Sequence, residues 1–145
     1  TPHGVERPSL EFAIERMKAT IDALRQVRKR VVLVAPLPRA DYNMGDCAER
    51  LLLGKPVLGP IDACRFNREA YMERHKEVMS FLEQMEKDDY VKVFRFEGFL
   101  CDNERCASTK DGVAIYRDGE HLSYRGAEYL GRTMGLADRL DRMAK

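Results

Sequence analysis

Apolar residues recur at helical spacing near the start of the chain, and a short apolar run follows them. Leu10, Met17, Ile21 and other apolar positions fall three or four residues apart, which predicts a helix over residues 8–27. Residues 31–35 form a continuous, mostly β-branched run, typical of a buried central strand in a parallel sheet. A helix followed by such a strand favours an α/β fold.

Later segments continue the alternation of helices and strands. Apolar positions between residues 70 and 85 predict a second helix with Asn67 as its N-terminal cap. Residues 90–96 alternate in part and predict a second strand, and residues 113–116 predict a short third one. Ser123 is placed to cap a last helix whose apolar positions continue to about residue 140.

Composition and charge narrow the class of protein. A length of 145 residues fits one domain, with 44% hydrophobic and 34% charged residues as in an ordinary globular protein. A net charge of +1 predicts neither nucleic-acid binding nor a polybasic membrane patch. No apolar run approaches the roughly 20 residues of a membrane span, and no signal peptide is recognisable. Because the chain begins at Thr1, we expect it to be part of a longer protein, with residues 1–7 as loop.

The cysteines leave several interpretations open. They are Cys47, Cys64, Cys101 and Cys106. Residues 41–65 have no clean period beyond a short helix over about 48–53, and so long an excursion needs a tether, which a Cys47–Cys64 disulfide would supply. Cys101 and Cys106 could close a small ring. Reduced thiols are the alternative, and so is a zinc site using this second pair with Asp118 and His121, although metal-site cysteines are usually spaced more tightly.

The candidate chemistry centres on Asp118 and His121. A carboxylate three residues before a histidine, with a glycine between, fits a tight turn that brings the carboxylate within reach of the imidazole. A carboxylate so placed fixes the histidine tautomer and stabilises the imidazolium, as a general base requires. On spacing alone an incidental surface ion pair fits as well. Arg39 follows the first strand, where it could face a ligand or solvent, and His75 is expected to be a solvated surface residue.

Three segments, taken in order, resemble one known family. Residues 116–127, YRDGEHLSYRGA, resemble the last motif block of the SGNH hydrolases, in the form (L/Y)-x-D-x-x-H-L-S-x-x-G-A found in SGNH domains fused to membrane acyltransferases of the acyltransferase family 3 type. Residues 30–38 are similar to that family's strand ending in Pro-x-Pro, and residues 100–106 to its cysteine-bearing loop. The resemblance spans about residues 10–140.

The resemblance implies a flavodoxin-like three-layer α/β/α sandwich with a mostly parallel sheet. Asp118 would orient His121, and His121 would activate a serine that carries the acyl group covalently. The implied activity is O-acyl transfer, with acetyl as the expected group, or ester hydrolysis, on a cell-envelope glycan. The implied setting is extracytoplasmic, with oxidised cysteines, a membrane acyltransferase domain as partner, and no cofactor, bound metal or nucleic acid.

The sequence departs from the family pattern at the nucleophile. It contains no Gly-Asp-Ser block, and its one Gly-Asp, Gly45-Asp46, precedes Cys47 and follows the first strand, the wrong order for that block. The serines lack a nucleophile-elbow context: Ser9, Ser80, Ser108 and Ser123. We therefore expect residues 1–145 to be the C-terminal portion of one SGNH domain, inactive alone, with the serine upstream. A stand-alone carbohydrate esterase and a non-catalytic interaction module of the same fold are the alternatives.

Overall fold

The structure is a computed structural model that describes residues 8–57 and 64–145. The predicted loop at residues 1–7, and residues 58–63 of the predicted excursion, lie outside the described residues. The elements run in the order α1 (Leu10–Gln26), β1 (Val32–Val34), α2 (Met44–Leu52), β2 (Arg65–Asn67), α3 (Arg68–Arg74), α4 (Lys76–Glu86), the 3-10 turn η2 (Lys87–Asp89), β3 (Lys92–Phe94), α5 (Glu97–Leu100), β4 (Arg105–Ala107), β5 (Thr109–Lys110), β6 (Val113–Ala114), α6 (Tyr124–Thr133) and α7 (Leu136–Met143).

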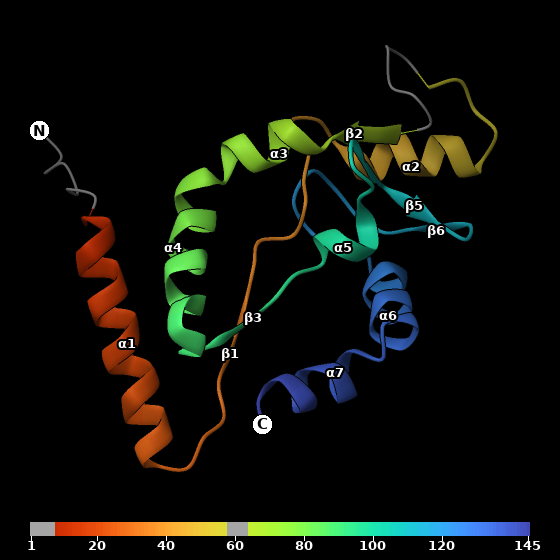
Figure 1. Cartoon of the computed structure of the whole chain (residues 1–145). Coiled ribbons are helices and arrows are strands. Elements are labelled where there is room, and N and C mark those ends of the chain that lie inside the picture. The colour runs from red at the N-terminus through yellow and green to blue at the C-terminus, as the bar shows by residue number, and fades with distance from the viewer. Residues whose placement is uncertain (1–7, 58–63) are drawn as a thin grey trace, which may run out of the picture.

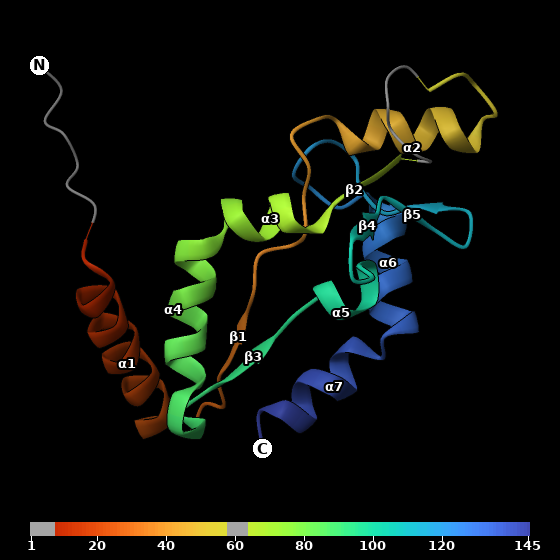
Figure 2. The same cartoon turned by 45° about the horizontal axis from the view of Figure 1, so that its top comes forward.

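A parallel pair of strands, β1 and β3, lies between two groups of helices (Figures 1 and 2). Leu33 and Val93 are opposite each other in this pair and pack toward α1 and α4 on one face. Val32 and Phe94 belong to the cluster that includes α6 and α7 on the other face. Because successive side chains of a strand point to opposite faces, both faces of the pair are covered. This layering confirms the predicted α/β/α class.

Local capping explains where the first helix begins. The Ser9 side chain accepts the backbone N–H of Phe12 at 3.2 Å, so α1 starts at Leu10 rather than at the predicted Pro8. Ile21 of α1 is buried against Met85 of α4. None of the helices within residues 8–57 and 64–145 is both long and apolar enough to cross a membrane.

Two segments predicted as single helices are each broken in two. The helix capped by Asn67, whose side chain accepts the N–H of Ala70 at 2.8 Å, ends at Arg74, and α4 begins after His75. The last helix breaks at Gly135, which adopts the left-handed conformation with a φ of 55°. Apolar spacing continues through both breaks, so periodicity alone could not reveal them.

The segment after β1 contains less irregular structure than the sequence predicts. Asn43 caps α2 by accepting the N–H of Asp46 at 3.2 Å, and the helix starts at Met44, before the predicted residue 48. The predicted Cys47–Cys64 disulfide is present, with a Cα–Cα distance of 5.7 Å. Past it, β2 pairs antiparallel with β4. The sequence analysis missed this pair because each strand has only three residues.

Cys101 and Cys106 also form a disulfide, across an antiparallel bridge. Because both sulfurs are bonded to each other, neither can serve as a thiolate ligand, and the zinc alternative loses two of its four donors. The chain then turns at Asp111 and Gly112, whose φ values of 48° and 75° suit a type I′ hairpin between β5 and β6.

The two disulfides are expected to contribute unequally to stability. Chain-entropy arguments give about 3 kcal/mol for the Cys47–Cys64 loop and about 2 kcal/mol for the smaller Cys101–Cys106 loop. We therefore expect Cys47→Ala/Cys64→Ala to lower the free energy of unfolding in urea more than Cys101→Ala/Cys106→Ala does. Equal losses, or peptide mapping that finds Cys47 joined to another cysteine, would contradict this ranking.

Candidate active site

The structure brings Asp118 and His121 together in one exposed turn between β6 and α6. Nδ1 of His121 lies 3.0 Å from Oδ2 and 3.1 Å from Oδ1 of Asp118. The side chain of His121 is 64% exposed and that of Asp118 36% exposed, so both can be reached from solvent. Within the described residues, Nε2 of His121 has no hydrogen-bond partner. The imidazole is therefore held at one nitrogen and open at the other, as a general base requires.

Backbone donors hold the carboxylate in place. Oδ1 of Asp118 accepts the N–H groups of Glu120 and His121, each at 2.8 Å. These two bonds, Glu120 first, and then the contact with the His121 ring hold the pKa of the Asp118 carboxyl well below its usual range. The turn is closed by the N–H of Arg117, which donates to the carbonyl of His121 at 2.9 Å. Asp118 is thus an ionised partner for the imidazole in a preformed turn.

The helix after the turn is fixed to the strand before it. Oγ of Ser123 accepts the N–H of Gly126 at 2.8 Å, as predicted for a cap, and donates to the carbonyl of Ala114 at 2.6 Å. A Cβ at Gly126 would overlap the backbone carbonyl of Ile115, so the first turn of α6 can approach β6 closely only because this residue is glycine. The Ser-x-x-Gly part of the motif is therefore a packing requirement that fixes both ends of the turn.

The loop after β1 supports the turn from the other side. The hydroxyl of Tyr116, a fully buried side chain, donates to the carbonyl of Pro38 at 2.5 Å, and burial raises the pKa of this phenol. A Cβ at Gly45, in the first turn of α2, would overlap the carbonyl of Arg117. Residues 36–45 therefore fix the backbone that leads into Asp118.

A polar cavity of about 370 Å³ borders the turn. It is lined by Ala40, Asp41, Tyr42, Asn43, Arg74, Gly119 and Glu120. Two ion pairs cross this region, Arg39 with Glu120 and Arg74 with Asp41. Because Glu120 and Gly119 are the two residues between Asp118 and His121, the cavity lies directly beside the candidate dyad.

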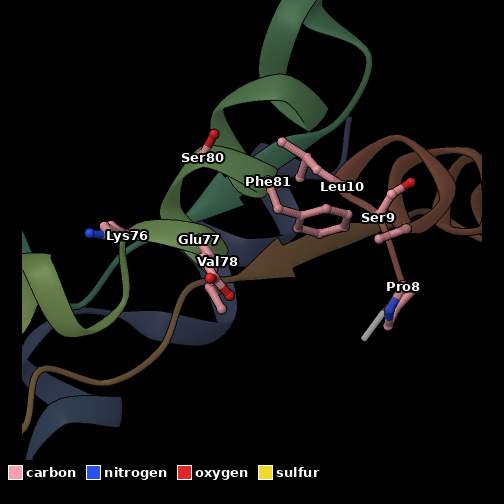
Figure 3. A pocket seen from close by; sticks show the side chains of 9 residues that line it. Pro8, Ser9, Leu10, Lys76, Glu77, Val78, Ser80 and Phe81 are labelled. Carbon is pink, nitrogen blue, oxygen red and sulfur yellow. The ribbon is translucent and has the colours of Figure 1, made fainter. Parts of the chain in front are cut away.

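A more apolar hollow of about 710 Å³ lies between α1 and α4 (Figure 3). Leu10 and Phe81 lie next to each other in its wall, and no dyad residue lines it. Because neither Asp118 nor His121 lines this hollow, we do not assign the chemistry there.

His75 differs from its prediction. Its ring packs on Tyr71 with centroids 5.2 Å apart, and its Nε2 is buried without a hydrogen-bond partner among the described residues. Desolvation, followed by the charges of Arg39 and Arg74, lowers the pKa of its imidazole. The expectation of a solvated surface histidine is therefore wrong, because the residue fills the break between α3 and α4.

None of the serines hydrogen-bonds to His121. Ser108 is buried and donates to the carbonyl of Cys64 at 2.6 Å, while Ser9 and Ser123 cap helices and Ser80 lies within α4. The sulfur of Cys47 is in a disulfide and cannot act as a nucleophile. The sequence analysis did not foresee Glu120 as a site residue, since its partner Arg39 lies 81 positions away and leaves no local spacing signal.

One family model matches most of the chain. The model of the family described as "SGNH domain (fused to AT3 domains)" matches residues 2–135. Among solved structures, the chain is similar to the periplasmic domain of a lipopolysaccharide acetyltransferase from Salmonella ser. Paratyphi A, with a TM-score of 0.58 and 15% identity over 94% of this chain and 53% of that one. This likeness shows a shared fold, and the chain spans about half the length of that domain. No curated protein matches the chain.

The close approach at Gly126 predicts a sharp contrast within α6. Gly126→Ala should lower the free energy of unfolding by about 3 kcal/mol or more, because its Cβ meets fixed backbone. Gly131→Ala in the same helix has open space around it and should be neutral or stabilising by up to about 1 kcal/mol. Urea unfolding of both variants measures the difference. Similar values for the two would refute the packing role of Gly126.

The Asp118 turn also predicts a pH dependence. The folded pKa is depressed, so its contribution to stability is complete above the ordinary aspartate pKa of about 3.9 and is lost only as the pH falls through the lower folded value. We expect the carboxyl carbon-13 shift of Asp118 to remain that of a carboxylate at about pH 3, where an ordinary aspartate is mostly protonated. A peptide of residues 114–126 is the unfolded control. A midpoint near the control value would show that the two N–H donors do not act on Asp118.

Proposed function

The chain belongs to the SGNH domains that are fused to AT3 domains, and on this basis we propose that it takes part in O-acyl transfer on a cell-envelope glycan. The expected acyl group is acetyl. The observation that carries the proposal is the Asp118–His121 contact at 3.0 Å, with Nε2 of the imidazole open to solvent. This arrangement supplies two of the three groups of a Ser-His-Asp triad.

In the proposed mechanism the Nδ1–H group of His121 donates a hydrogen bond to the Asp118 carboxylate, and its proton stays on the imidazole. Nε2 then takes the proton of a serine hydroxyl as its oxygen attacks the carbonyl carbon of an acyl donor. The leaving oxygen receives that proton from the imidazolium, and the acyl group stays on the serine. A glycan hydroxyl next gives its proton to Nε2 as its oxygen attacks the carbonyl carbon of the acyl-serine. The imidazolium returns that proton to the departing serine oxygen, which regenerates both the serine and the base. Water in place of the glycan gives ester hydrolysis by the same residues, and no cofactor is needed.

We propose that the serine comes from a segment outside residues 1–145. The chain has no Gly-Asp-Ser block, and none of its serines bonds to His121. In the described part of the chain β1 pairs only with β3, so its other edge has no strand partner there. A further parallel strand could add there. A domain about twice this length, like that of the structural neighbour, has room for such a segment.

The proposed setting is extracytoplasmic, with a membrane acyltransferase domain as the partner that supplies the acyl donor. Fusion to AT3 domains in this family supports such a partner, and the structural neighbour is a periplasmic domain. Two disulfides fit an oxidising compartment. A non-catalytic interaction module is the second candidate, favoured by the lack of a serine hydrogen-bonded to His121.

The experiment is ester turnover by the full-length protein that contains this chain. His121→Ala should lower turnover by about 10³-fold or more, because a triad without its base loses nucleophile activation. His75→Asn is the matched control and should retain turnover, since His75 lies in a helix break and Asn suits the first position before a helix.

The isolated 145-residue chain should hydrolyse p-nitrophenyl acetate no faster than free histidine does. Unchanged turnover in full-length His121→Ala would refute the catalytic assignment. Serine-dependent hydrolysis by the isolated chain would refute the proposal that the nucleophile lies elsewhere.

A further inference from the structure

We propose that Arg39 and Glu120 form a positioning pair, which holds the turn between Asp118 and His121 so that the imidazole proton stays on Nδ1. The inference rests on the proposed function, because it concerns the same dyad. It adds two residues that the family motif does not specify, since Glu120 occupies a free position of D-x-x-H and Arg39 lies in another segment.

The pair joins two segments that are far apart in the sequence. Arg39 lies on the loop after β1, and its guanidinium forms an ion pair with the carboxylate of Glu120, 81 residues later. The side chain of Arg39 is only 31% exposed, and its Nε is buried without a hydrogen-bond partner among the described residues. A guanidinium in this position is restrained by its surroundings, so it can act as a fixed point for Glu120.

The side chain and the backbone of Glu120 have different partners. Its carboxylate binds Arg39, and its N–H is one of the two donors to Oδ1 of Asp118. A contact that fixes the Glu120 side chain therefore restrains the same residue whose N–H orients the Asp118 carboxylate. Gly119 also lies against this loop, since a Cβ built at this position would be 3.3 Å from the carbonyl oxygen of Tyr42. Both residues between Asp118 and His121 thus contact the loop after β1.

The charged side chains that contact Asp118 directly are not those of Arg39 and Glu120. His121 and Arg117 are the charged or titratable side chains that contact its carboxylate, the latter at 3.4 Å. Arg39 and Asp41 of the loop after β1, and Arg74 at the end of α3, lie near the turn without touching Asp118. Arg39 therefore influences Asp118 by fixing the position of Glu120 and not by its own charge. This distinguishes the pair from ordinary exposed ion pairs, which contribute little to stability.

The experiment measures the tautomer of His121 from the nitrogen-15 shifts of its ring, in the 145-residue chain at a pH at which the imidazole is neutral. The nitrogen that carries the proton is set by the hydrogen bond that it makes, so Nδ1–H reports the contact with Asp118. We expect Nδ1–H in the unaltered chain and a larger Nε2–H fraction in both Arg39→Met and Glu120→Gln. Amide exchange at residues 120 and 121 should become about tenfold faster in both.

The two variants separate positioning from charge. Loss of the Arg39 cation and loss of the Glu120 anion change the field at Asp118 in opposite directions, so a purely electrostatic pair would shift the tautomer oppositely. A positioning pair predicts the same direction for both, and rescue by Arg39→Lys. Arg65→Met removes an ion pair of similar exposure, 38% and 56%, elsewhere on the surface and should change nothing.

Opposite shifts, no shift in either variant, or an equal shift in Arg65→Met would overturn the proposal. The proposed function fails on a different measurement, since it depends on ester turnover by the full-length protein. If the tautomer experiment fails while His121→Ala still loses turnover, the proposed role of Asp118 and His121 stands. Only the positioning role of Arg39 and Glu120 is then refuted.

Discussion

The close packing of the loop after β1 against the segment that leads into Asp118 is the constraint on which the rest of the site depends. A turn of the form Asp-x-x-His forms its own hydrogen bonds, but these do not place it in the molecule. Placement comes from the Tyr116 hydroxyl on the carbonyl of Pro38 and from the contact of Gly45 with the backbone of Arg117. Since this loop leaves the carboxyl end of β1, these contacts place the dyad at the carboxyl edge of the β1–β3 pair, the edge at which ligands of open α/β sheets bind.

Turn and helix-capping preferences predicted those contacts of the site that join residues close together in the sequence. The Asp118–His121 contact, the Ser123 cap and the Asn67 cap each depend on residues within four positions of one another, and all three have the expected partners. The breaks at His75 and Gly135 were not predictable from apolar spacing, because the hydrophobic stripe continues on both sides of each. The Arg39–Glu120 pair and the pairing of β2 with β4 join distant segments, so only the folded chain reveals them.

In the proposed account Asp118 and His121 are two of the three groups of a catalytic triad, and the backbone contacts that hold them are all present in the described residues. The Asp118 carboxylate is ionised and accepts two backbone hydrogen bonds, and the imidazole has one nitrogen without a hydrogen-bond partner among the described residues. Glycines allow neighbouring backbone segments to come close enough to hold the turn. No side-chain hydroxyl within residues 8–57 and 64–145 is hydrogen-bonded to that imidazole nitrogen. In the proposed account the unpaired edge of β1 and the missing hydroxyl have the same explanation. A parallel strand added at that edge would bring a nucleophile to the same end of the sheet as His121.

Covalent labelling of the full-length protein with a fluorophosphonate tests this account most directly, because the reagent reacts with a serine only when a base has activated it. The account predicts labelling of one serine outside residues 1–145, located by peptide mass spectrometry, and loss of the label when His121 is replaced. Labelling of Ser9, Ser80, Ser108 or Ser123, or labelling that persists without His121, would contradict it.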